Sequence, residues 1–212
     1  MRTSELIAAL SADPVPEPIR LGRRVAAAIA LGLVVSLSIY AMRMGLRPNF
    51  AEAARTVRFD LKFVDAFAFA LPSLLLTLQL ARPDARPRAL ALWLLAPLII
   101  LAAGVVVELI VVPRDEWLSR LVGHNAKFCT VMIPTLAAPI LAAVIVALRA
   151  GAPLRPALTG ALAGAASAGI AALLYATHCP DDSPLFVATW YPLGTLICMG
   201  VGALAGRRFL AW

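Results

Sequence analysis

Apolar residues gather into six long stretches, and short polar segments separate them. The stretches run approximately over Val25–Met42, Phe63–Ala81, Ala89–Val112, Phe128–Leu148, Pro156–Tyr175 and Phe186–Gly206. A helix needs about 20 apolar residues to cross the roughly 30 Å hydrocarbon core of a bilayer. An isolated segment of this kind satisfies its backbone polar groups in lipid only as a helix. The pattern therefore predicts an all-α fold: a polytopic transmembrane bundle of six helices that forms one domain over residues 25–212.

Residues 1–24 precede this bundle and predict a short amphipathic helix followed by a tether. Thr3 or Ser4 can cap the helix, and Leu6, Ile7 and Leu10 fall on one of its faces. Prolines then end the helix and stiffen the tether, at Pro14, Pro16 and Pro18. Such a helix can dock in a partner's groove, or it can lie on the membrane surface or against the protein's own loops.

The composition supports the membrane class. Hydrophobic residues make up 61% of the chain and charged residues 15%, whereas soluble domains average about 45–50% and about 25%. The net charge of +7 comes from basic residues in the loops, where they orient a membrane protein, so we expect no direct contact with nucleic acid. A cytoplasmic N-terminus places eleven Lys and Arg inside and eight outside, which predicts a bacterial inner-membrane protein with both termini in the cytoplasm.

Two acidic residues lie in or near the predicted spans. A carboxylate inside a bilayer is costly and is a functional candidate by default. Asp65 and Glu108 both lie towards the outer ends of their spans. We expect them to reach the interface and to pair with outer-loop basic residues such as Arg114. The alternative is a small six-span transporter or channel that uses them.

Two cysteines are predicted to share the outer face. Cys129 begins the fourth span and Cys179 lies in the last outer loop, with His124 and His178 close to them in sequence. Thiolates and imidazoles are soft-metal ligands, and a periplasmic face is oxidising. The pair could form a structural disulfide, a redox-responsive thiol pair or a metal site whose candidate ligands are Cys129, Cys179 and His178. Cys198 lies inside the sixth span, where we expect it to act as a small hydrophobe.

Three features of the chain resemble the NrsF-type anti-sigma factors, a family of six-span inner-membrane proteins. They are the opening segment Met1–Leu10 with its Pro-rich continuation, Cys129 at the head of the fourth span, and the loop His178-Cys179-Pro180-x-Asp182-Ser183-Pro184. The chain end, Gly206-Arg207-Arg208 with Trp212, adds to the third feature. The resemblance covers essentially the whole chain.

The resemblance implies a regulator and not an enzyme, with no cofactor. The N-terminal segment would hold an extracytoplasmic-function sigma factor at the membrane, and an oxidative or heavy-metal signal in the periplasm would release it. Cys129 and Cys179 match the family's paired cysteines, and His124, His178 and Asp182 are possible accessory residues. Leu6, Ile7 and Leu10 are partner-binding candidates from their spacing alone. A membrane thiol oxidoreductase is disfavoured, because the chain has no C-x-x-C pair.

Overall fold

The computed structural model describes residues 2–12, 20–84 and 87–211, and in the first helix it describes only the backbone of residues 6, 8–10 and 12. Every regular element in the described residues is a helix, as predicted. The elements are α1 (Thr3–Ala12), α2 (Leu21–Arg43), α3 (Phe50–Ala53), α4 (Val57–Leu80), α5 (Arg88–Ala91), η1 (Leu92–Leu94), α6 (Leu95–Val111), η2 (Arg114–Glu116), α7 (Trp117–Val122), α8 (Ala126–Leu148), α9 (Pro156–Ala176) and α10 (Pro184–Phe209).

Six helical segments among the described residues are long and apolar enough to cross a membrane, which confirms the predicted spans. The largest difference in a boundary is at α4, which begins at Val57 and not at Phe63. The Thr56 hydroxyl caps this helix by accepting a hydrogen bond from the Phe59 backbone N–H at 3.4 Å, and Asp60 lies in the first turn, where the helix dipole favours an acid. Hydropathy alone missed this turn because its residues are charged.

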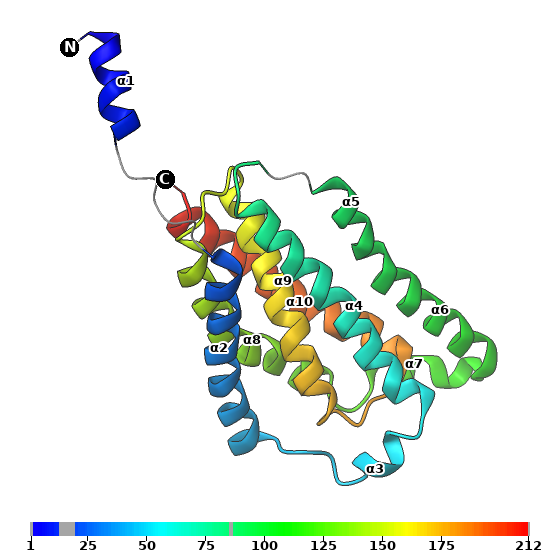
Figure 1. Cartoon of the computed structure of the whole chain (residues 1–212). Helices are drawn as coiled ribbons and strands as arrows, with labels where there is room; N and C mark the ends of the chain where they lie inside the picture. Colours follow the sequence, from blue (N-terminus) through cyan, green and yellow to red (C-terminus); the bar gives the residue numbers. More distant parts are fainter. Residues whose placement is uncertain (1, 13–19, 85–86, 212) are drawn as a thin grey trace.

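The helices form a bundle around α9 (Figure 1). α9 packs against α4, α8 and α10, α2 packs along α8, and α6 lies at the edge against α4 and α10. Small residues pack densely between α9 and α10. A Cβ added at Gly160 would overlap the carbonyl oxygen of Gly202, so the two backbones touch, as small residues allow in membrane helices.

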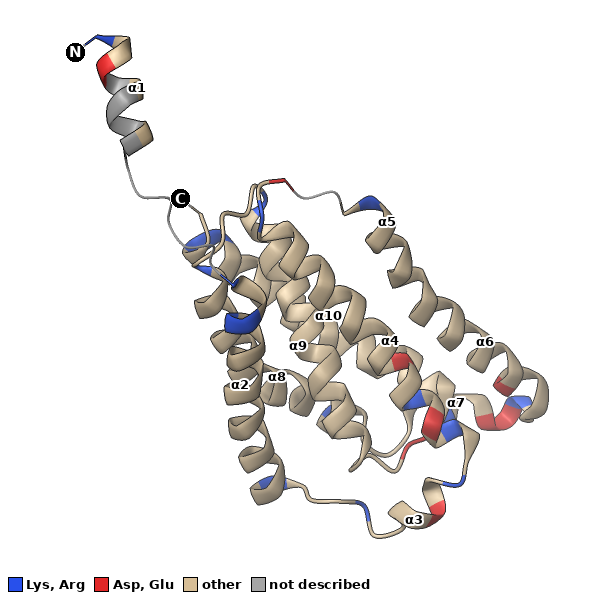
Figure 2. Cartoon of the chain, viewed as in Figure 1, with Lys and Arg blue, Asp and Glu red and all other residues tan. Residues whose placement is uncertain are grey.

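The bundle has two distinct ends (Figures 1 and 2). The termini end carries the start of α2, the end of α10 and the 149–155 loop. The cysteine end carries the 44–56, 112–125 and 177–183 segments. Acidic side chains are concentrated at the cysteine end (Figure 2), whereas exposed arginines are more numerous at the termini end, where they include Arg23, Arg149 and Arg207.

The predicted N-terminal helix is present as α1. Of its three candidate partner-binding residues, Ile7 is 62% exposed, and the side chains of Leu6 and Leu10 lie outside the described residues. The proline tether also lies outside them. An exposed isoleucine on a helix that precedes the bundle is available for contact with another surface.

Candidate functional site

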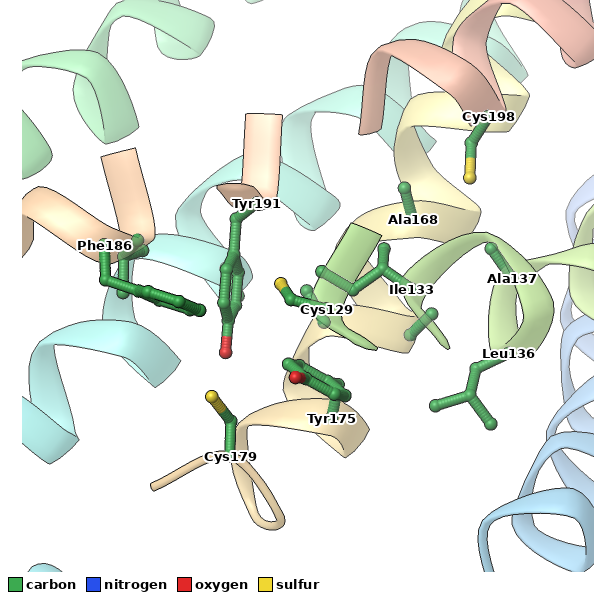
Figure 3. Packing of buried hydrophobic residues seen from close by; sticks show 14 of the residues in the cluster. Cys129, Ile133, Leu136, Ala137, Ala168, Tyr175, Cys179, Phe186, Tyr191 and Cys198 are labelled. Carbon is green, nitrogen blue, oxygen red and sulfur yellow. The ribbon is translucent and has the colours of Figure 1, made fainter. Parts of the chain in front are cut away.

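Cys129 and Cys179 come together at the cysteine end of the bundle. Cys129 lies in the first turns of α8 and Cys179 in the loop between α9 and α10, and both are free thiols with 0% exposure. Figure 3 shows the Cys129 sulfur beside the Tyr191 ring and the Cys179 sulfur near the Tyr191 hydroxyl, with the Tyr175 side chain next to them. The structure thus unites two thiols that the sequence placed only on a common face.

Aromatic side chains enclose these thiols. Tyr175 and Phe186 are fully buried and Tyr191 nearly so, and the two tyrosine rings meet edge to face with their centroids 5.9 Å apart. We call these three residues with Cys129 and Cys179 the cysteine cluster. Both tyrosine hydroxyls are buried and have no hydrogen-bond partner among the described residues. They lie beside the two sulfur atoms (Figure 3), so they can donate hydrogen bonds to sulfur or to an oxygen atom added to it.

Asp182 holds two buried cations against the loop that carries Cys179. It pairs with Arg47 at 2.9 Å and with Lys62 at 2.5 Å. The same two cations donate to the Cys179 carbonyl oxygen, Arg47 at 3.2 Å and Lys62 at 3.0 Å. We call these three side chains the ion-pair clamp. It fixes the Cys179 backbone to the loop after α2 and to α4.

Asp181, the neighbouring acid, has different hydrogen-bond partners. Its carboxylate accepts hydrogen bonds from the backbone N–H groups of His124 and Asn125, the closer at 2.9 Å. These groups lie at the N-terminus of α8, where an acid is favourable. Asp181 therefore ties the last loop to the start of the helix that carries Cys129.

The two histidines lie apart from the thiols. The His124 side chain is 94% exposed, and Nδ1 of His178 lies 3.0 Å from the Gly45 carbonyl oxygen. The His178 ring also stands against Phe128, with centroids 5.7 Å apart. Within the described residues, no group of three or more His, Cys, Asp or Glu side chains is placed to hold a metal ion. Any metal at the cysteine cluster would therefore rest mainly on the two sulfur atoms.

Burial keeps the resting thiol of Cys179 protonated. Desolvation raises the pKa of Cys179 above its ordinary value, and the nearby positive charge of Lys62 offsets part of this rise. The thiolate is the reactive form of cysteine. Reaction at Cys179 therefore requires a displacement that admits water or a reagent to the cluster.

Glu108 has a structural role. Its side chain is 1% exposed and accepts hydrogen bonds from the Ser183 hydroxyl at 2.7 Å and the Leu185 backbone N–H at 3.0 Å. These bonds cap α10 and tie it to α6. Its ionic partners are Arg58 at 3.8 Å and Arg120 at 3.5 Å. Glu108 therefore pairs with basic residues as expected, but Arg114, the residue suggested from the sequence, is not one of them. One of the two carboxylates that suggested a transporter is therefore a helix cap.

Asp65 does not form the expected interfacial pair. Its Oδ1 atom is buried and has no hydrogen-bond partner among the described residues, and no ion pair to Asp65 is found there. Its side chain lines a cavity between helices. Cys198, by contrast, is 3% exposed in the apolar core and stands apart from the other cysteines in Figure 3, as a small hydrophobe would.

The sequence pattern missed Arg47, Lys62, Asp181 and the two tyrosines of the cluster. Lys62 and Arg47 were counted only as loop charges that orient the protein. Two signals in the sequence could have suggested a buried ion pair. One is a lysine at the start of an apolar helix, and the other is a pair of adjacent acids in an otherwise apolar half of the chain.

The chain is similar to known regulators along its whole length. A family described as "Negative regulator of sigma F", NrsF, matches residues 9–212. The anti-sigma-F factor NrsF of Caulobacter vibrioides is 33% identical over 221 residues, and all of both chains is covered. The probable anti-sigma-F factor NrsF of Azospira oryzae is 31% identical over 213 residues, again with full coverage of both chains. No solved structure matches the chain.

Proposed function

The chain belongs to the NrsF family of negative regulators of sigma F, and from this premise we propose that it is an anti-sigma factor of the inner membrane that responds through its cysteine pair. Residues 1–24 would hold an extracytoplasmic-function sigma factor on the cytoplasmic side, with Leu6, Ile7 and Leu10 as the contact residues. Oxidation of Cys129 and Cys179, or a soft metal bound between them, would release it. Residues 25–212 form the membrane domain that joins the two events.

The proposed orientation has both termini in the cytoplasm. Exposed arginines at the termini end support it, because cytoplasmic loops carry an excess of basic residues: Arg23, Arg24, Arg149, Arg155, Arg207 and Arg208. The cysteine end then faces the periplasm, where thiols can be oxidised. The sensor and the binding segment would lie on opposite sides of the membrane.

One observation carries the proposal: Cys129 and Cys179, 50 residues apart in sequence, converge with both sulfur atoms free and buried. A disulfide needs Cα atoms within about 7 Å and correctly directed side chains. Both residues lie in one buried cluster beside Tyr175 and Tyr191 (Figure 3), and this proximity supports a bond between them once the loop that carries Cys179 shifts.

The chemistry is a two-step oxidation by a peroxide. One thiol attacks a peroxide oxygen, becomes a sulfenic acid and releases water. The second thiol attacks that sulfur, forms the disulfide and releases a second water. The two tyrosine hydroxyls, unpaired at rest, can donate to the sulfenic oxygen. A thiophilic metal would instead displace the two thiol protons and join the same sulfur atoms.

Helices α8 and α2 would transmit the conformational change from the cysteines to the cytoplasmic side. A bond between the cysteines pulls the first turns of α8 towards the loop whose carbonyl oxygen holds the ion-pair clamp. α2 follows α8 closely, because the Ser36 hydroxyl donates to the Leu136 carbonyl oxygen at 2.7 Å and a Cβ on Gly32 would overlap the backbone of Ile140. α2 begins at Leu21, so its first residues belong to the proposed binding segment, residues 1–24.

The switch needs a definite coupling energy. A 100-fold loss of sigma affinity requires about 2.7 kcal/mol of difference between the two states. The bond drives the change only if its geometry fits one of the two folded states better than the other by about this amount.

The test is a sigma-dependent reporter in cells that carry Cys129→Ser, Cys179→Ser or both, exposed to hydrogen peroxide or cadmium. We expect all three variants to repress the reporter at rest and to lose induction. Cys198→Ser is the matched control and should respond as the wild type does. Normal induction in all three variants, with equal protein in the membrane, would show that the thiol switch is wrong.

A further inference from the structure

A cavity of about 220 Å³ lies between α4, α6, α9 and α10, within the predicted membrane region. Apolar side chains make up most of its wall, among them Phe69, Leu101 and Met199. Leu98 and Leu196, also in the wall, are 64% and 61% exposed. Because exposed leucines on spans face lipid, the cavity is reached sideways from the bilayer.

Asp65 is the acidic group of this cavity. It lies eight residues into α4, which is about 12 Å along the helix at 1.5 Å per residue. Its buried Oδ1 atom has no hydrogen-bond partner among the described residues. A carboxylate held in apolar surroundings is costly unless a charge or donor pairs with it. Its position at a cavity wall leaves room for a partner that is not part of the chain.

The nearest suitable cation of the chain is committed elsewhere. Lys62 precedes Asp65 by three residues, so both lie on neighbouring positions of α4. Its ammonium is paired with Asp182 at 2.5 Å and donates to the Cys179 carbonyl oxygen at 3.0 Å. No lysine or arginine lines the cavity among the described residues. Among the described residues, no ion pair compensates the charge of Asp65.

We propose that this cavity binds a small lipophilic amine, whose ammonium group pairs with Asp65 while its apolar body lies between α6 and α10. An ammonium supplies opposite charge and three donors, whereas a neutral alcohol supplies one donor. The volume suits a single ring, since an apolar cavity of about 150 Å³ accommodates benzene. Tyr191 lines this cavity and also belongs to the cysteine cluster, where its hydroxyl lies near the Cys179 sulfur (Figure 3), so the two sites share this side chain.

The test uses fluorine NMR of the full-length protein in nanodiscs with para-trifluoromethylbenzylamine as the probe. Para-trifluoromethylbenzyl alcohol is its neutral counterpart of nearly equal shape. A charge-assisted hydrogen bond predicts that the wild type binds the amine at least about 10-fold more tightly than the alcohol. Asp65→Asn should abolish this preference, and Asp65→Glu should retain part of it.

Asp60→Asn is the matched control, since Asp60 is an exposed acid on the same helix, and it should bind both probes as the wild type does. Leu98→Trp gives a second perturbation at the exposed rim and should weaken both probes by narrowing the entrance, even if Asp65→Asn fails to fold. Equal binding of amine and alcohol by the wild type would overturn the proposal. So would undiminished amine binding by a folded Asp65→Asn, or no binding of either probe, which would mean that water alone occupies the site.

Discussion

The ion-pair clamp gives the sharpest prediction, because one carboxylate holds two buried cations. The side chains of Arg47 and Lys62 are 6% and 1% exposed, and that of Asp182 is 19% exposed. Removing one partner of a buried pair typically costs about 3–5 kcal/mol, since it leaves an uncompensated buried charge. Asp182 is partly exposed, and an asparagine would still accept a hydrogen bond. We therefore expect Asp182→Asn to lower the free energy of unfolding by about 3 kcal/mol, the lower end of that range.

Two measurements check this value. Chemical unfolding in detergent gives the loss of stability directly. Maleimide labelling, in a background of Cys129→Ser and Cys198→Ser, reports the exposure of Cys179 alone. Because the clamp holds the Cys179 carbonyl oxygen, its loss should raise the labelling rate at least about 10-fold, the effect of about 1.4 kcal/mol in a local opening equilibrium.

The reasoning also predicts a partial rescue. Lys62→Met added to Asp182→Asn removes one of the two stranded charges and keeps a side chain of similar length, so the double variant should be more stable than Asp182→Asn alone. Asp115→Asn, an exposed acid at the same end, is the control and should change stability by less than about 0.5 kcal/mol. Two results would refute this reasoning: Asp182→Asn as stable as this control, or a further loss of stability when Lys62→Met is added. Either result would mean that the ion-pair clamp does not stabilise the folded protein.

Three further predictions concern other parts of the chain. Ile7→Asp on the exposed face of α1 should weaken sigma binding by the full-length protein at least about 10-fold, measured by surface plasmon resonance; unchanged affinity would exclude Ile7 from the contact. Gly160→Leu should destabilise the bundle by about 3 kcal/mol or more through overpacking against α10, measured as a loss of thermal stability, whereas Gly200→Ala, where space is open, should be tolerated. Burial raises the pKa of Cys179, so the folded state retains its proton; the stabilisation is fully present below the unfolded pKa of about 8.5 and declines above it. Unfolding measured between neutral and alkaline pH should show a shallower decline for Cys179→Ser, and equal slopes would contradict this account.

The spans and the helical class follow from the sequence by itself. Hydropathy sums the transfer energy of neighbouring residues, and in a bilayer that local sum decides which segments become helices. The α1 helix was predictable for similar local reasons. The same local sum missed the first turn of α4, because Arg58 and Lys62 are polar although the cap and the dipole favour a helix there.

The site depended on tertiary structure. Lys62 and Asp182 are 120 residues apart, and no local pattern relates them. The paired cysteines were predicted to share a face, but their meeting inside a buried aromatic cluster results from the packing of α8, α9 and α10. The packing of α6 against α10 gave Glu108 its role as a cap, and the packing around α4 left Oδ1 of Asp65 without a hydrogen-bond partner among the described residues. Local energies determine where each helix runs, whereas the pairing of charges and thiols is decided by which helices pack together.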